Sequence, residues 1–228
     1  MTALETAIEC VLFDLDGTLI DTAADFVLVL NSLMDEEGIT RIDPQRIGQT
    51  VSDGARGLIR LGFGLEQGAA EFERLLQRLL DLYYQQLLHT QAALYPGLDE
   101  LLEKFSAAGI LWGIVTNKPE KYSLRLLEQL GLSERCNVLV CPDHVTNRKP
   151  HPEPLFLACE KLSCDRERTV YVGDHIRDMQ AAKNADLIAI AAAYGYLGEN
   201  DRIEEWNADF VIRNPNDLEG LLGILKFA

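Results

Sequence analysis

The feature that most constrains the fold of this chain is a series of short, uninterrupted apolar runs of strand length. The runs are continuous rather than alternating, which is typical of strands buried on both faces of a parallel sheet. Segments with the apolar spacing of helices lie between most of them, so we predict a doubly wound, Rossmann-like α/β fold. The expected strands are Ile8 to Phe13, Ile110 to Val115, Asn137 to Cys141, Thr169 to Val172 and Leu187 to Ala193, with Phe210 to Ile212 a weaker sixth.

Four helices are expected between these strands. The first has Pro96 in its first turn and Gly109 as its stop signal, which is the usual placement of these two residues. The others are expected from Pro119 to Gly131, from Glu153 to Leu162 and from Asp178 to Ala185. Each is followed by the next apolar run, as a parallel sheet with crossover helices requires.

The stretch between the first two strands has a different pattern. Residues 18–92 hold helical patterns and no convincing strand, and about seventy residues is too long for an ordinary loop. We interpret residues 18–92 as an inserted α-helical domain and residues 1–17 and 93–228 as the α/β core domain, with hinges near Thr18 to Asp21 and Gln91 to Pro96. Alternatively, these helices pack on the sheet as extra layers.

Polar residues follow the expected strands. They are Asp14-Leu15-Asp16-Gly17-Thr18, Thr116-Asn117-Lys118, Lys149-Pro150 in the third loop, and Gly173-Asp174 with Asp178 four residues later. Ligands of open α/β sheets bind at the carboxyl ends of the strands, so these residues are expected at one edge. Crowded carboxylates need protonation or a bound cation, and oxygen ligands favour magnesium. A calcium-binding loop is the other interpretation of Asp-x-Asp-Gly, but Leu19 occupies the position where such a loop needs glycine.

Composition limits the partners. The chain has 36 acidic and 21 basic residues and a net charge of -15, which opposes nonspecific binding to nucleic acid or to an anionic membrane. An anionic substrate would need a local positive site. We find no run of roughly 20 apolar residues and no secretion signal, so a cytoplasmic protein is expected. The five cysteines show no zinc-ligand spacing and are expected to be reduced, with zinc or disulfide roles as the alternative.

The ordered motifs resemble those of the haloacid dehalogenase superfamily, in its phosphatase branch with a helical cap. The four motifs are Asp14-x-Asp16-Gly17-Thr18, Thr116-Asn117, Lys149-Pro150 and Gly173-Asp174-x-x-x-Asp178. Each comes at an expected strand end or in the loop that follows. The resemblance covers nearly the whole chain and implies a phosphoric monoester hydrolase that works through an aspartyl-phosphate.

The resemblance also implies roles for the motif residues. Asp14 would be the nucleophile, and magnesium would be held by the Asp14 carboxylate, the Asp16 backbone carbonyl and Asp174, with Asp178 bound directly or through water. Bringing the nucleophile to about 4 Å from a phosphate dianion costs roughly 8 kcal/mol at an effective dielectric near 20. The metal would offset this repulsion, and Lys149 would supply a second positive charge.

Other motif residues would bind the phosphoryl group or move protons. Thr116, Asn117 and backbone N–H groups around Gly17 would hold the phosphoryl oxygens, although Gly17 is alternatively a plain turn glycine. Asp16 would protonate the leaving alcohol and later deprotonate water, and adjacent negative charge would raise its pKa. His175 stands where the family often has serine, threonine or aspartate. It either lies outside the set of metal ligands or acts as a metal ligand or proton carrier.

Substrate specificity is expected in the helical cap. Arg56, in a polar segment with glycines on both sides, would bind a substrate carboxylate in two-pronged fashion, or else is a solvated surface residue. The sequence is similar to phosphoglycolate phosphatases, through segments such as Val115 to Pro119, and within that branch to enzymes acting on N-acetylmuramic acid 6-phosphate. Both substrates carry a carboxylate. A sugar phosphomutase and a noncatalytic binding protein are the competing functions.

Overall fold

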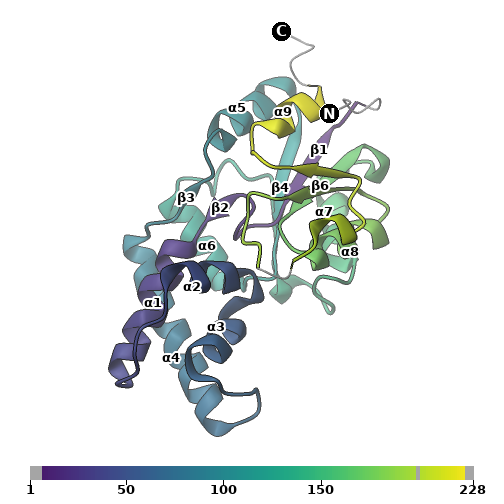
Figure 1. The fold of residues 1–228 in the computed structure, drawn as a ribbon. Helices are drawn as coiled ribbons and strands as arrows, with labels where there is room; N and C mark the ends of the chain where they lie inside the picture. The colour runs from purple at the N-terminus through teal and green to yellow at the C-terminus, as the bar shows by residue number, and fades with distance from the viewer. Residues whose placement is uncertain (1–6, 199–200, 224–228) are drawn as a thin grey trace.

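The core of the molecule is a six-stranded parallel sheet in the order β5-β4-β1-β6-β7-β8. The computed structural model describes residues 7–198 and 201–223, and Figure 1 shows their arrangement. All the predicted strands are present, and the doubly wound α/β fold is confirmed. The strands are β1 (Cys10–Phe13), β4 (Leu111–Val115), β5 (Val138–Val140), β6 (Thr169–Gly173), β7 (Ile188–Ala192) and β8 (Phe210–Ile212).

Both faces of the sheet are buried, which explains the continuous apolar runs. Along β1, Val11 and Phe13 join one apolar cluster, whereas Cys10 and Leu12 join another on the opposite face. The first face is covered by α5 (Leu98–Ala108), α6 (Glu120–Gln129) and α9 (Asp217–Leu222). The second face is covered by α7 (Glu153–Leu162) and α8 (Ile176–Asn184).

Two of the predicted helices begin elsewhere than expected. Pro96 lies outside α5, which begins at Leu98 after Gly97 in a left-handed conformation. α8 begins at Ile176 instead of Asp178, because His175 caps its first turn. Cap geometry decides both starts, and the apolar periodicity alone does not reveal it.

The segment between β1 and β4 is helical, as predicted. It contains α1 (Ala23–Glu36), α2 (Pro44–Thr50), the 3-10 turn Val51–Asp53, α3 (Gly54–Phe63) and α4 (Ala70–Gln86). In Figure 1 these helices lie below the sheet, beyond its carboxyl edge, and are not stacked over its faces. Their division from the core as a separate domain stays a prediction.

One feature of this segment was not predicted. β2 (Ile20–Asp21) and β3 (Ala93–Leu94) form a two-stranded antiparallel pair at the two places expected to be hinges. The prediction of no strand in residues 18–92 is therefore wrong for β2, since two residues are too few to produce a strand pattern. The helices α1 to α4 are thus joined to the sheet by two chain segments held together.

Within the described residues, no helix is long and apolar enough to cross a bilayer.

The strand register determines where the site lies. Phe13 at the end of β1 pairs with Ile114 of β4 and Val172 of β6. The strand order reverses at β1, and in such sheets ligands bind beyond the carboxyl ends at the reversal. The residues after β1, β4 and β6 therefore emerge side by side, facing the helices α1 to α4.

Candidate active site

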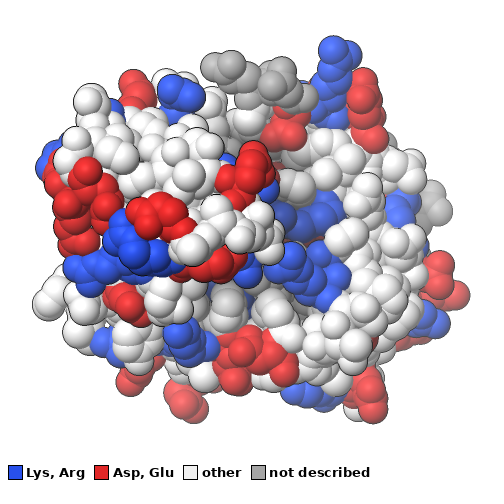
Figure 2. Space-filling view, turned by 90° about the horizontal axis from the view of Figure 1, so that it is seen from below, with Lys and Arg blue, Asp and Glu red and all other residues white. Residues whose placement is uncertain are grey.

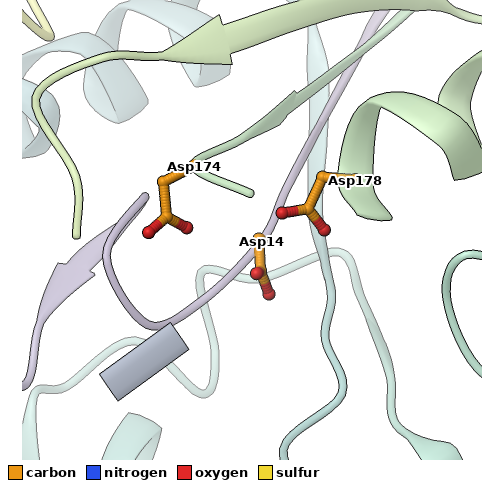
Figure 3. Close-up of side chains that lie close together, drawn as sticks. All are labelled: Asp14, Asp174 and Asp178. Atoms are coloured by element: carbon orange, nitrogen blue, oxygen red, sulfur yellow. The ribbon is translucent and has the colours of Figure 1, made fainter. Parts of the chain in front are cut away.

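Three buried carboxylates meet at the carboxyl edge of the sheet. Asp14 follows β1, Asp174 follows β6 and Asp178 lies in the first turn of α8. One oxygen of each lies within 4.8 Å of the others, and all three residues are buried. Figure 3 shows the side chains pointing toward one another. The structure therefore brings together three of the four predicted metal ligands.

The proximity of these groups changes their acidity. Burial, with smaller contributions from Asp14 and Asp178, raises the pKa of Asp174 to about 7. Burial also raises the pKa of Asp178, an effect that Lys149 partly opposes. One ammonium group against three carboxylates leaves excess negative charge, and the donors are all hard oxygens. These residues therefore fit a divalent cation, which members of the family implied by the motifs generally use.

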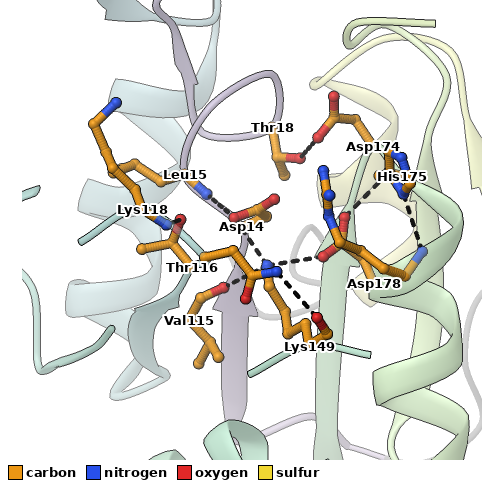
Figure 4. A network of polar contacts seen from close by, with 12 residues as sticks. Asp14, Leu15, Thr18, Val115, Thr116, Lys118, Lys149, Asp174, His175 and Asp178 are labelled. Carbon is orange, nitrogen blue, oxygen red and sulfur yellow. Dashed lines mark hydrogen bonds and ion pairs between the residues drawn. The ribbon is translucent and has the colours of Figure 1, made fainter. Parts of the chain in front are cut away.

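Lys149 is held at the centre of the cluster. Its Nζ lies 3.0 Å from Asp14 Oδ1, 2.8 Å from Asp178 Oδ1, 2.9 Å from the Val115 carbonyl oxygen and 2.7 Å from the Tyr171 hydroxyl. Its side chain is fully buried, and Figure 4 shows it reaching between the two carboxylates. A charge in this position is desolvated, so it acts on Asp14 with little screening by water.

Glycines allow the chain to pack directly against Asp174. Gly17 has a φ of +81°, and a Cβ there would lie 2.3 Å from Asp174 Oδ2. A Cβ on Gly195 would lie 2.3 Å from the Asp174 Cβ. The N–H of Gly17 donates to the Ile20 carbonyl at 2.9 Å. Gly17 is thus required by its close packing against the Asp174 carboxylate, and its contact with a phosphoryl group stays a prediction.

The side chain of Asp16 is not part of the cluster of three carboxylates. Its Oδ1 accepts from Thr22 Oγ1 at 2.7 Å and from Lys118 Nζ at 2.8 Å. The charged group that contacts Asp16 is therefore a cation, whereas the sequence predicted negative charge beside it. Lys118 was not predicted to have a role, because only the folded loop turns its side chain back to β1. The metal contact predicted for the Asp16 carbonyl stays a prediction.

Lys118 is also enclosed by the helical segment. Its Nζ lies 5.1 Å from the centre of the Phe26 ring and 4.6 Å from that of the Tyr83 ring. Phe26 belongs to α1 and Tyr83 to α4. Aromatic faces stabilise a desolvated ammonium group. The cation that holds Asp16 is therefore contributed by the core and surrounded by the inserted helices.

The predicted phosphate ligands lie beside Asp14. Thr116 Oγ1 accepts from the Lys118 N–H at 3.1 Å, which leaves its own proton to donate. Asn117 Nδ2 donates to the Lys149 carbonyl at 3.0 Å, whereas Asn117 Oδ1 is buried with no hydrogen-bond partner among the described residues. Asn117 thus positions the Lys149 loop, and phosphate binding by both residues stays a prediction.

The inserted segment reaches the site through residues just before the predicted substrate ligand. Ser52 Oγ donates to Asp174 Oδ2 at 2.8 Å, and Arg177 of α8 donates to the Ser52 carbonyl. Arg56 is exposed, and its Nη1 lies 4.0 Å from Glu73 Oε1. Sequence spacing gave no signal for Ser52, because the orientation of the helices relative to the sheet is a tertiary property. The substrate role of Arg56 stays a prediction.

His175 occupies a capping position. Its Nδ1 accepts from the Arg177 N–H at 3.1 Å, and its own N–H donates to Asp178 Oδ2 at 3.1 Å. Its Nε2 lies 3.9 Å from Asp53 Oδ1. The ring therefore faces the helical segment, and its contact with the carboxylate cluster is made by the backbone.

Tyr196 connects the cluster to the hinge. Its N–H donates to Asp174 Oδ2 at 3.1 Å, and its hydroxyl donates to Asp21 Oδ1 at 2.7 Å. The same hydroxyl accepts from the Thr22 and Ala23 N–H groups at 2.5 and 2.8 Å. One residue thus holds both the Asp174 carboxylate and the start of α1.

The charge distribution suits an anionic ligand despite the acidic composition. Figure 2 shows several Lys and Arg side chains in and beside a hollow near the middle of one face, with Asp and Glu side chains also close to its rim. Positive potential in a hollow attracts anions locally even when the net charge is negative. The arrangement agrees with the local positive site expected from the sequence.

Comparison with known proteins identifies relatives along almost the whole chain. A family model described as haloacid dehalogenase-like hydrolase matches residues 11–192. The chain is 41% identical to the N-acetylmuramic acid 6-phosphate phosphatase of Pseudomonas aeruginosa, over 94% of this chain and 95% of that protein. It is also 41% identical to a phosphoglycolate phosphatase of Xanthomonas campestris, over 91% and 93% of the two chains. The crystal structure of a predicted phosphoglycolate phosphatase from Haemophilus somnus matches with a TM-score of 0.81 at 25% identity, covering 97% of this chain and 98% of that one.

Replacing the most strongly perturbed carboxylate should separate metal binding from folding. In metal-free protein at pH 8, we expect Asp174→Asn to stabilise the fold by roughly 1–3 kcal/mol, because it removes a desolvated charge beside Asp14. The new amide can donate to the Thr18 hydroxyl, which lies 2.9 Å from Asp174 Oδ1. Magnesium should raise the melting temperature of the parent and leave that of the variant unchanged. Thermal unfolding with the exposed Asp99→Asn as control measures both effects; a variant still stabilised by magnesium would contradict this assignment.

The effect of magnesium on stability should depend on pH. In metal-free protein the folded state holds a proton on Asp174 between about pH 4 and about pH 7, where the unfolded state has released it. This stabilisation is complete below about pH 4 and is lost as the pH rises through about 7. Because that proton competes with the cation, the magnesium-induced rise in melting temperature should be small at pH 5 and large at pH 8. A rise equal at both pH values would show that Asp174 does not bind the metal.

Proposed function

This chain belongs to the haloacid dehalogenase-like hydrolases and hydrolyses phosphate monoesters, and on that premise we propose a magnesium-dependent phosphatase with Asp14 as its nucleophile. The observation that carries the proposal is that Asp14 contacts the buried Lys149 ammonium group and also lies in one cluster with the carboxylates of Asp174 and Asp178. Asp178 also contacts the Lys149 ammonium group. Of the three carboxylates in the described cluster, however, only Asp14 follows β1, the strand at which the strand order reverses.

The contacts of Asp14 orient it for attack on phosphorus. Oδ1 accepts from Lys149 Nζ at 3.0 Å and from the Leu15 N–H at 2.7 Å. Both contacts hold one oxygen in place and leave Oδ2 to form the bond to phosphorus. The ester oxygen then leaves, and the product is a phosphoryl group linked to Asp14.

Positive charge must accompany this step. Magnesium bound by Asp14, Asp174 and Asp178 would supply charge beside the phosphoryl oxygens and reduce the repulsion between the two anions. Lys149 contributes a buried charge in contact with both Asp14 and Asp178. The Thr116 hydroxyl, whose oxygen already accepts from Lys118, can donate to a phosphoryl oxygen.

Asp16 serves as the acid and then as the base. It follows Asp14 by two residues, and its carboxylate is held by Thr22 and Lys118. In the first step it gives a proton to the leaving oxygen. In the second step it takes a proton from the water that attacks phosphorus, which releases phosphate and regenerates Asp14. Both partners of Asp16 are donors, and they hold its carboxylate in place.

The relatives and the inserted helices support a proposal for the substrate class. The relatives described above are a phosphatase for N-acetylmuramic acid 6-phosphate and one for phosphoglycolate. Both compounds carry a carboxylate in addition to the phosphate. We propose a small carboxylate-bearing phosphate ester as the substrate, with 2-phosphoglycolate as the first choice and N-acetylmuramic acid 6-phosphate as the alternative. Arg56, four residues beyond the Asp174 contact of Ser52, is the proposed carboxylate ligand.

Substitutions of the two aspartates after β1 should have different kinetic consequences. Asp14→Asn should reduce turnover by roughly 10⁴-fold or more, because no aspartyl-phosphate can form. Asp16→Asn should reduce steady-state turnover by roughly 10²- to 10⁴-fold. With an aryl phosphate, whose leaving group needs little protonation, Asp16→Asn should still release about one aryl alcohol per enzyme in a rapid first phase.

Rapid-mixing measurement of aryl alcohol and of inorganic phosphate distinguishes the two variants. The exposed Asp99→Asn is the control and should behave as the parent. Turnover by Asp14→Asn at the parental rate would exclude the covalent route. Steady release of inorganic phosphate by the parent separates hydrolysis from a mutase reaction.

Matched pairs of esters test the carboxylate preference. We expect kcat/KM to be at least about tenfold higher for 2-phosphoglycolate than for 2-hydroxyethyl phosphate, or for N-acetylmuramic acid 6-phosphate than for N-acetylglucosamine 6-phosphate. Whichever pair shows the larger preference identifies the substrate. Arg56→Ala should remove the preference, whereas Arg60→Ala, an exposed arginine on the same helix, should retain it. An unchanged preference in Arg56→Ala would remove Arg56 from the site.

A further inference from the structure

Three of the five cysteines lie together at the edge of the sheet opposite the carboxylate cluster. Cys10 is the first residue of β1 and pairs in register with Thr169, the first residue of β6. Cys159 lies in the last turns of α7, and Cys164 lies in the connection from α7 to β6. Cys159 and Cys164 line the same pocket, and the hydroxyl of Thr169, the register partner of Cys10, donates to Cys164 Sγ at 3.4 Å. The phosphatase mechanism uses none of these groups.

The end of α7 brings Cys159 and Cys164 close to each other. Ser163 has a φ of +54°, and the Cys164 N–H donates to the Cys159 carbonyl at 3.1 Å, five residues back. This is the hydrogen bond of a Schellman motif, in which the side chains of the two bonded residues commonly make contact. Disulfides need Cα atoms about 4.4–6.8 Å apart, and a backbone hydrogen bond between the two residues brings their Cα atoms into that range.

The pair is accessible from solvent. An open surface pocket of about 500 Å³ is lined by Phe156, Cys159, Glu160, Ser163, Cys164 and Arg166. Cys164 is partly exposed, whereas Cys159 is 5% exposed and Cys10 is fully buried. A small solute can therefore reach Cys164 first and Cys159 next to it.

The neighbouring groups also favour the thiolate of Cys164. The nearby thiols of Cys10 and Cys159 lower the pKa of the Cys164 thiol to about 3, and burial opposes this shift only in part. The same contacts, together with burial, raise the pKa values of Cys10 and Cys159. Cys164 Sγ also lies 3.4 Å from the Thr169 hydroxyl. A partly exposed thiolate beside a protonated thiol is the arrangement of a reactive cysteine with a resolving partner.

We propose that Cys164 is a hydroperoxide-reactive thiol and that Cys159 resolves it as a disulfide. The Cys164 thiolate attacks one oxygen of hydrogen peroxide, the O–O bond breaks, and Cys164 sulfenic acid and hydroxide form. The Cys159 sulfur then attacks the sulfenic sulfur, which releases water and forms the Cys159–Cys164 bond. Sulfur is oxidised by two electrons, and peroxide is the oxidant that is reduced.

Cys159 is the resolving partner because of its place in the turn. Cys10 lies between two strands, paired with Leu111 on one side and Thr169 on the other, so its backbone cannot adjust to the geometry of a disulfide. Cys159 and Cys164 flank a turn at the end of a helix, beside the pocket. Helix ends open locally more easily than central strands of a sheet.

Peptide mapping of the reduced full-length protein tests the proposal. The protein is treated with hydrogen peroxide, its remaining thiols are alkylated, and its peptides are analysed by mass spectrometry. We expect a disulfide between Cys159 and Cys164, formed at least about tenfold faster than oxidation of Cys136, whose thiol donates to the Val138 carbonyl. In Cys159→Ser, Cys164 should instead accumulate as a sulfenic acid that dimedone traps, and Cys136→Ser should behave as the parent.

Two results would overturn the proposal. One is that Cys164 remains reduced under conditions that oxidise Cys136. The other is that Cys164 becomes linked to Cys10 in the parent protein. The parent map gives both answers without any variant, and neither depends on phosphatase activity.

Discussion

The constraint on which the site depends is the crowding of three carboxylates in a buried position. Asp14, Asp174 and Asp178 are brought together by the register of adjacent parallel strands and by the start of α8. Burial, together with the smaller effect of the neighbouring charges, raises the pKa of Asp174 to about 7, and Lys149 offsets only part of the charge. The neighbouring groups either donate to these oxygens or make room for them. A bound divalent cation is the remaining way to neutralise the cluster at neutral pH.

Asp174 is also the point at which the core and the inserted helices meet. Its oxygens accept from Thr18 at the hinge, from Ser52 in the helical segment and from the Tyr196 N–H. Lys118 makes a second connection, since it contacts Asp16 while enclosed by rings of α1 and α4. The positions of the inserted helices and of Asp16 and Asp174 are therefore coupled by direct contacts. A substrate that moves these helices would change the hydrogen bonds of Asp16 and Asp174 as well.

Much of the fold could be predicted because its determinants are local. Continuous apolar runs such as that of β1 indicated strands buried on both sides, and the structure places alternate residues of β1 in two different clusters. The starts of α5 and α8 and the short strand β2 were missed, since they depend on Gly97, on the His175 cap and on pairing with β3. Caps and two-residue strands leave no periodic pattern in the sequence.

The sequence by itself determined the α/β architecture and the residue types at the ends of its strands, because apolar periodicity and motif order are properties of the chain. Asp14, Lys149, Asp174 and Asp178 could be proposed together because parallel strands end at one edge. Only the tertiary structure decided the partners of these residues: Lys118 for Asp16, Ser52 and Tyr196 for Asp174, and Cys159 for Cys164. These contacts join segments whose relative orientation is set by side-chain packing or by the conformation of a single turn, and neither is encoded in spacing along the chain.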